Sequence, residues 1–219
     1  MSANIASVDA SVDLTVGLSH EVTAEVDHGL PGTAPQAEAT VPIVKTPTSP
    51  VNPASGLVLH WPTEAATEAF AQTLAAQPGL RTAFIELHGD LGAGKTTLVR
   101  HLLRALGVQG RVKSPTFAVV EPYTVADANA PSGQLDIWHF DFYRFDDPRE
   151  WADAGFRDIF ASLGLKLAEW PANVGADLPQ ADLSIRISVH DDASRSAEVI
   201  APTALGTAIL QALAAGAAT

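Results

Sequence analysis

One stretch of the chain decides its fold, and it reads Gly89-Asp90-Leu91-Gly92-Ala93-Gly94-Lys95-Thr96. This stretch satisfies the pattern G-x-x-x-x-G-K-[ST], in which glycines let backbone N–H groups turn toward phosphate oxygens. An apolar strand is expected before it, over Thr82 to Leu87, and a helix after it, over about Thr96 to Leu106. Lys95 would reach the β- and γ-phosphates of a nucleotide, and the Thr96 hydroxyl would ligate Mg²⁺. The stretch therefore predicts a phosphate-binding P-loop at a helix N-terminus.

The residues around this loop alternate between strand and helix patterns. Further strands are expected at Leu57 to His60, Ala118 to Tyr123, Leu135 to Phe142 and Leu165 to Trp170, with a hairpin of Leu183 to Val189 and Ala197 to Ile200. Further helices are expected at Thr63 to Gln77, Pro148 to Ala161 with a break at Gly155, and Pro202 to Ala214. The alternation predicts an α/β fold of the P-loop NTPase type, with a partly parallel sheet and helices on both faces.

Residues 1–55 differ in composition from the single domain expected over 56–219. They contain no Phe, Trp or Tyr, one base against six acids, and six prolines from Pro31 onward. This composition predicts a disordered acidic extension rich in Pro, Ala, Val and Thr, although Val8 to Leu18 could dock on the domain as a short strand. Residues 1–20 lack Lys and Arg, which argues against a secretory signal. The sequence contains no apolar run of about 18 residues, so it predicts no membrane span. We expect a cytoplasmic protein.

The composition of the 219 residues excludes several kinds of function. Thirteen Lys and Arg against 25 Asp and Glu give a net charge of −12, which argues against an autonomous nucleic-acid binder. The chain has no cysteine, which excludes disulfides, thiolate zinc sites, iron–sulfur clusters and cysteine nucleophiles. Residues 81–113 nevertheless hold six bases against two acids, a local charge that suits a nucleotide polyphosphate.

Two acids follow apolar strands, at the sheet edge where ligands bind in open α/β sheets. Asp141 ends the run that begins at Ile137, and Glu169 ends the run that begins at Leu165. Either could hold Mg²⁺ or orient a water, and either could be an ordinary acid at a strand end. His139 lies on the same strand face as Asp141, and we favour a structural or hydrogen-bonding role over metal ligation, because the sequence shows no further His cluster.

The segment Ser114-Pro115-Thr116-Phe117 lies between the expected P-loop helix and the next strand. Many P-loop proteins place a switch there, and either hydroxyl could contact the γ-phosphate or a water on the metal. A strand-entry turn with self-satisfied hydroxyls explains the segment equally well.

Four sequence blocks together are similar to one bacterial family. They are GDLGAGKTT at Gly89 to Thr97, VKSPTFAVVEPY at Val112 to Tyr123, HFDFYR at His139 to Arg144 and LAEWP at Leu167 to Pro171. Their order and spacing resemble the TsaE (YjeE) family, small P-loop ATPases needed for N6-threonylcarbamoyladenosine (t6A) at position 37 of tRNAs that read codons beginning with A. The resemblance covers about residues 57–205 and leaves the extension without a counterpart.

The resemblance implies roles for particular residues. Gly89 to Thr97 would bind ATP, Thr96 and Glu169 would bind Mg²⁺, and Asp141 would serve the hydrolytic water or the metal's outer ligands. Ser114 and Thr116 would form the switch-like segment. Trp170 would pack near the nucleotide or present a partner surface. Glu64, within Trp61 to Thr67, and Arg195 would approach the nucleoside.

The resemblance also implies partners. These are TsaD-like and TsaB-like proteins, which would contact tRNA while this chain hydrolyses ATP to reset the complex.

Two alternative functions remain open. A small P-loop kinase would need an Arg-rich lid, for which Arg144 and Arg149 are the only strong candidates. A nucleotide-gated adaptor would assemble partners without needing hydrolysis.

Overall fold

The structure is a computed structural model that describes residues 56–130, 132–145, 151 and 155–216. The expected extension, residues 1–55, lies outside this part of the chain, and so does the segment Val8 to Leu18. The disordered-tail and docked-strand interpretations of the extension therefore both stay predictions, as does the domain boundary at residue 56.

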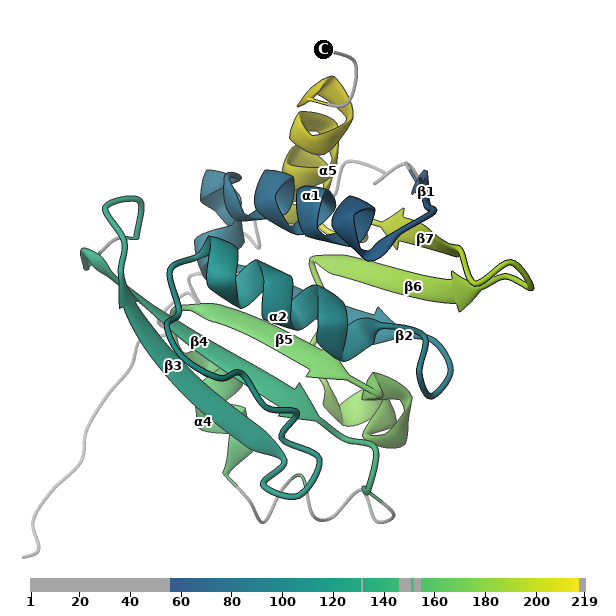
Figure 1. The fold of residues 1–219 in the computed structure, drawn as a ribbon. Coiled ribbons are helices and arrows are strands. Elements are labelled where there is room, and N and C mark those ends of the chain that lie inside the picture. Colours follow the sequence, from purple (N-terminus) through teal and green to yellow (C-terminus); the bar gives the residue numbers. More distant parts are fainter. Residues whose placement is uncertain (1–55, 131, 146–150, 152–154, 217–219) are drawn as a thin grey trace, which may run out of the picture. The chain divides into compact units, whose positions relative to one another are not determined.

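Seven strands form one mixed sheet in the order β1-β7-β6-β2-β5-β4-β3 (Figure 1). The strands are β1 (Gly56–Trp61), β2 (Phe84–His88), β3 (Val120–Ala126), β4 (Gln134–Asp141), β5 (Leu165–Glu169), β6 (Leu183–Val189) and β7 (Arg195–Ile200). The central strand β2 runs parallel to both β5 and β6, and β5 runs parallel to β4. The outer strands β1, β7 and β3 pair antiparallel. The predicted partly parallel α/β sheet is confirmed.

Helices cover both faces of this sheet, as predicted (Figure 1). One face carries α1 (Glu64–Ala75), α2 (Lys95–Ala105) and α5 (Ala204–Gly216), and the other carries α4 (Phe156–Ala161). Short 3₁₀ helices are η1 (Pro78–Thr82), η2 (Pro171–Asn173) and η3 (Gly175–Asp177). No helix in the described residues is long and apolar enough to cross a membrane.

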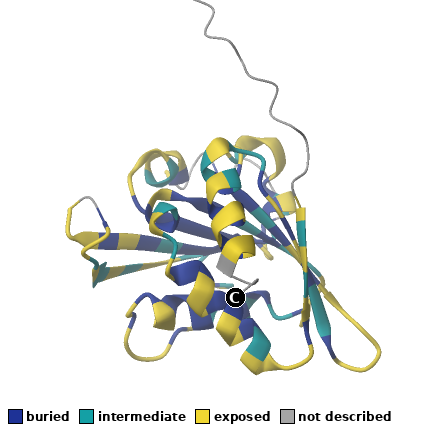
Figure 2. Cartoon of the chain, turned by 90° about the horizontal axis from the view of Figure 1, so that it is seen from above, coloured by how far each residue is buried: buried dark blue, intermediate teal, exposed yellow. Residues whose placement is uncertain are grey.

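Two apolar cores result from the alternation of side chains along the strands. Under α2, leucines at helical spacing are buried, with Leu98, Leu102 and Leu103 each at most 2% exposed. The opposite core is aromatic, and Phe140 lies 5.5 Å from Phe142 and 5.3 Å from Phe156 between ring centroids. Figure 2 shows the buried residues along the strands and the exposed ones on outer helix faces and loops. This packing holds the strand ends, and the side chains they carry, in fixed positions.

The start of one strand differs from expectation. β3 begins at Val120 rather than Ala118, because Val119 adopts a left-handed conformation with φ 67° and donates its N–H to Pro115 O at 2.6 Å. These residues therefore form a turn before the strand. The helical pattern over Pro148 to Ala161 is described only in part, and within it α4 begins after Gly155, the expected break.

Candidate nucleotide site

The loop between β2 and α2 has the backbone geometry that its glycines predict. Gly89, Gly92 and Gly94 have φ of 134°, 81° and 108°, a region that other residues rarely adopt. A Cβ on Gly89 would lie 2.3 Å from the carbonyl oxygen of Ile187 on β6, so no larger residue fits there. Gly94 is the N-cap of α2, so the partial positive charge of the helix N-terminus adjoins the loop.

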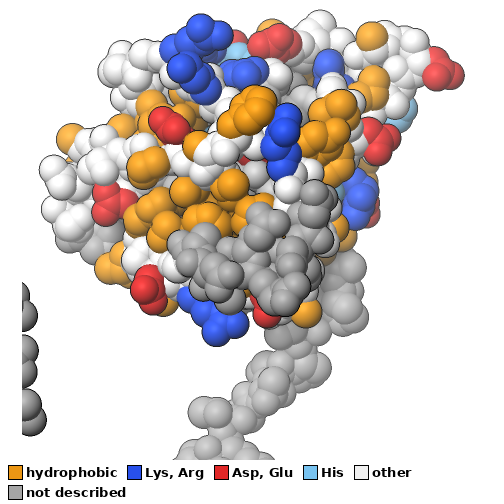
Figure 3. Space-filling view, turned by 90° about the horizontal axis from the view of Figure 1, so that it is seen from below, with side chains coloured by type: hydrophobic (Ala, Val, Ile, Leu, Met, Phe, Trp, Pro, Cys, Tyr) orange, Lys and Arg blue, Asp and Glu red, His pale blue; other side chains and the backbone are white. Residues whose placement is uncertain are grey.

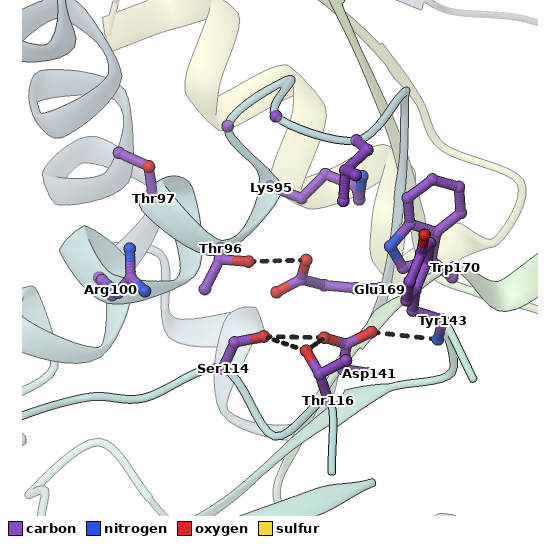
Figure 4. A pocket seen from close by; sticks show the side chains of 13 residues that line it. Lys95, Thr96, Thr97, Arg100, Ser114, Thr116, Asp141, Tyr143, Glu169 and Trp170 are labelled. Carbon is purple, nitrogen blue, oxygen red and sulfur yellow. Dashed lines mark hydrogen bonds between the residues drawn. The ribbon is translucent and has the colours of Figure 1, made fainter. Parts of the chain in front are cut away.

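A cavity of about 300 Å³ lies beside this loop. Figure 4 shows that its side chains come from the start of α2, from the segment around Ser114, and from the C-terminal ends of β4 and β5. The lining residues are Leu91, Gly92, Gly94, Lys95, Thr96, Thr97, Arg100, Ser114, Thr116, Asp141, Tyr143, Glu169 and Trp170. Residues more than 70 positions apart in the sequence thus converge on one space.

Lys95 is the first residue of α2 and is only 4% exposed. Its Nζ donates to the carbonyl oxygens of Gly89 at 2.7 Å and Asp90 at 2.9 Å, and it lies 3.9 Å from the centroid of the Trp170 ring. Burial lowers the pKa of Lys95, and the nearby carboxylates of Glu169, Asp141 and Asp90 oppose that change. A partly desolvated ammonium beside a cavity favours an anionic ligand such as a phosphate.

Thr96 and Glu169 form the second feature of the cavity. The Thr96 Oγ1 donates to Glu169 Oε2 at 2.9 Å, and Glu169 is 2% exposed. The register of β4 and β5 pairs Asp141 with Glu169, so both carboxylates reach the same edge of the sheet. His139 lies on the same face, and its Nε2 is 2.9 Å from Glu169 Oε1. The hydrogen-bonding role that the sequence favoured for His139 is the one the structure has.

Asp141 accepts three hydrogen bonds. The Ser114 Oγ donates to its Oδ2 at 2.7 Å and the Thr116 Oγ1 at 2.6 Å, while the Tyr143 N–H donates to its Oδ1 at 3.1 Å (Figure 4). Ser114 Oγ and Thr116 Oγ1 are themselves 3.0 Å apart. The segment that the sequence linked to the γ-phosphate is therefore bonded directly to the carboxylate of Asp141.

The oxygen donors in the cavity fit Mg²⁺. Mg²⁺ binds through one or two carboxylates and substrate phosphates while it keeps several waters. Thr96, Glu169 and Asp141 supply a hydroxyl and two carboxylates on one side of the cavity. The described part of the chain contains no group of three or more His, Asp or Glu side chains that could enclose a metal. The donor set therefore suits a metal shared with a nucleotide rather than a metal held by protein alone.

Glu64 and Arg195 lie at a second, smaller cavity of about 30 Å³, which Gly94 and Thr97 share with the first. Glu64 Oε1 is 3.0 Å from Nε2 of His101, and Arg195 Nε donates to Ala93 O at 2.9 Å. The structure thus brings both residues to the other side of the loop from Asp141 and Glu169.

Sequence reasoning missed two residues of the main cavity. Arg100, on the P-loop helix, is half-buried and lines the cavity. Tyr143 also lines it, with its ring 5.1 Å from that of Trp170. Its position two residues after Asp141 was the available signal. Arg144, a candidate for a kinase lid, instead lies 4.3 Å from the Phe117 ring, and Arg149 lies outside the described residues.

Comparison with known proteins agrees with this geometry. Residues 61–197 match the family model described as "Threonylcarbamoyl adenosine biosynthesis protein TsaE". The TsaE protein of Haemophilus influenzae is 43% identical over 65% of this chain and 85% of its own length, and that of Bacillus subtilis is 37% identical over 59% and 75%. The crystal structure of Bacillus subtilis YdiB superposes with a TM-score of 0.59 at 25% identity, covering 74% of this chain and 96% of that one. The chain therefore belongs to the TsaE family of t6A biosynthesis.

Proposed function

We propose that this chain binds ATP with Mg²⁺ in the main cavity and hydrolyses it as the ATPase subunit of t6A formation at position 37 of tRNAs reading ANN codons. One observation carries the proposal. Lys95, the Thr96–Glu169 pair and Asp141 all line the same cavity at a helix N-terminus. This is the set of groups that phosphoryl transfer requires, namely an anion cradle, oxygen ligands for a metal and a carboxylate near the attacking water.

Each residue has a separate task in this proposal. The backbone N–H groups of residues 89–97 and the ammonium of Lys95 would hold the phosphates. The ammonium would exchange its bonds to Gly89 O and Asp90 O for bonds to phosphate oxygens. The Thr96 hydroxyl and Glu169 carboxylate would hold Mg²⁺, which when bound would neutralise charge that develops on the phosphates. Glu64 and Arg195, at the smaller cavity, would approach the nucleoside.

Asp141 would orient the hydrolytic water. An ionised carboxylate offers about four lone-pair positions. Ser114, Thr116 and the Tyr143 N–H use three of them, which leaves about one for a water. Because three donors fix the orientation of the carboxylate, that water would be held in one place rather than among several.

The surface near the cavity supports partner binding. Phe117 is 85% exposed and Leu91 74% exposed, and each belongs to a segment that lines the cavity. Elsewhere on the described surface, Figure 3 shows hydrophobic side chains gathered on the face seen from below, with Lys and Arg side chains nearby. Exposed apolar side chains that gather in one contiguous patch mark interaction sites. We assign the exposed apolar groups to binding of TsaD-like and TsaB-like partners in the cytoplasm. These partners would hold the tRNA, because the net charge of −12 on this chain disfavours binding of RNA.

The test is capture of the full chain by immobilised TsaB-like and TsaD-like proteins with and without Mg-ATP. We expect ATP-dependent capture, ATP turnover that rises when the partners are added, and loss of both with Lys95→Ala. The proposal would be contradicted by capture that does not depend on ATP, together with ATP turnover that depends neither on the partners nor on Lys95. Turnover that requires a small phosphoryl acceptor would identify a kinase. An Asp141→Asn variant that supports repeated rounds of tRNA modification would identify an adaptor.

A further inference from the structure

His139 is a buried polar residue to which the proposed ATPase cycle gives no task. It lies on β4 and is fully buried, at 0% exposed. Its backbone pairs with Leu167 on β5, so Glu169, two residues further along β5, is its diagonal neighbour on the same face. This register brings the imidazole Nε2 to 2.9 Å from Glu169 Oε1.

The Glu169 carboxylate is consequently held at both of its oxygens. Thr96 bonds to Oε2 and His139 bonds to Oε1, each at 2.9 Å. A carboxylate held only through Oε2 could rotate about its terminal bond, which is a soft torsion. The bond from His139 removes that freedom and keeps Oε2 directed toward Thr96 and the cavity.

The direction of this hydrogen bond follows from the chemistry of the two groups. An ionised carboxylate only accepts, so the proton lies on Nε2 of His139. The other ring nitrogen, Nδ1, is buried and has no hydrogen-bond partner among the described residues. Buried polar atoms are usually paired, because a lost partner is costly. The other buried apolar side chains on this strand face are Ile137 and Leu135. An apolar side chain in place of His139 would therefore be enough for packing.

We propose that His139 is a positioning residue that orients the Glu169 carboxylate for Mg²⁺ in the nucleotide complex. The inference rests on the proposed Mg-ATP function and assigns His139 no contact with metal or nucleotide. Partners that hold a metal ligand from behind fix its orientation, and their loss typically weakens metal binding by about 10- to 100-fold. His139 should therefore act on metal affinity and leave metal-free nucleotide affinity unchanged.

The experiment measures two affinities of the full chain. Mn²⁺, whose free ion is counted by electron paramagnetic resonance, is titrated into protein saturated with a non-hydrolysable ATP analogue. ADP binding in excess EDTA is measured separately by calorimetry. We expect His139→Leu to weaken Mn²⁺ binding by about 10- to 100-fold with unchanged ADP affinity. His139→Gln should restore most of the Mn²⁺ affinity, because its amide nitrogen reaches the place of Nε2.

The matched control is Leu135→Ala, which damages the same buried strand face without touching Glu169. It should lower thermal stability and leave Mn²⁺ affinity unchanged. Wild-type Mn²⁺ affinity in His139→Leu overturns the inference, as does an equal loss in the Gln, Leu and Leu135→Ala variants. Should His139→Leu fail to fold, His139→Asn decides in its place, since its shorter amide cannot reach Glu169. A wild-type chain that binds no Mn²⁺ with the analogue would instead refute the proposed function itself.

Discussion

Replacing Gly89 by alanine tests the close approach of the P-loop to the sheet. The new Cβ would lie 2.3 Å from the Ile187 carbonyl oxygen and 3.2 Å from the Ala93 Cβ. The backbone at φ 134° adds strain of about 1–3 kcal/mol, and forcing an atom into a packed site adds about 1–3 kcal/mol more. We expect a loss of about 2–6 kcal/mol in the free energy of unfolding. For a domain of this size, that loss corresponds to a melting temperature lower by about 4–24 °C.

Gly92→Ala is the matched comparison. Gly92 also has a positive φ, 81°, but a Cβ there meets no atom within 4 Å. Only the conformational strain remains, about 1–2 kcal/mol, or about 2–8 °C in melting temperature. Thermal unfolding of both variants, followed by circular dichroism, checks the order. The reasoning is refuted if Gly92→Ala unfolds at or below the temperature of Gly89→Ala.

Two further predictions concern the carboxylates and a buried arginine. Glu169→Ala should lose Mg²⁺-dependent nucleotide binding, while Asp141→Ala should bind the nucleotide normally but hydrolyse it poorly. Calorimetry measures the binding and phosphate release the hydrolysis, and the reverse pattern would mean that the two residues have exchanged roles. Arg81→Met should cost about 1.5–3 kcal/mol, because Arg81 Nε bonds to the half-buried Asp127 at 2.9 Å and its removal leaves that carboxylate with the Asn129 N–H at 2.8 Å. Urea unfolding checks this, and adding Asp127→Asn should recover part of the loss; no recovery would mean that the backbone bonds of Arg81 to Ala75 O and Gln77 O dominate.

The sequence could predict the features that depend on local pattern. The loop glycines and Lys95 follow from one motif, and Asp141 and Glu169 follow from apolar runs that end in an acid. These inferences need only the periodicity of strands and the rule that parallel strands end at one edge. The predicted fold class is confirmed for the same reason.

The contacts between those residues could not be predicted, because they depend on strand register and turn geometry. The bond from His139 to Glu169 exists only in the register that pairs Asp141 with Glu169. The bonds from Ser114 and Thr116 to Asp141 depend on the turn in which Val119 adopts a positive φ, which is uncommon for a β-branched residue. A shift of one residue in the pairing of β4 with β5 would have sent the side chains of the shifted strand to the other face of the sheet.

Calorimetry of a non-hydrolysable ATP analogue with Mg²⁺ measures whether the main cavity binds Mg-ATP through Lys95. We expect saturable binding to the full chain at one site, and loss of that binding with Lys95→Ala. The Lys95→Ala chain should still unfold cooperatively, which separates loss of the site from loss of the fold. Equal affinity of the wild-type chain and the Lys95→Ala variant for the analogue would show that Lys95 does not hold the nucleotide.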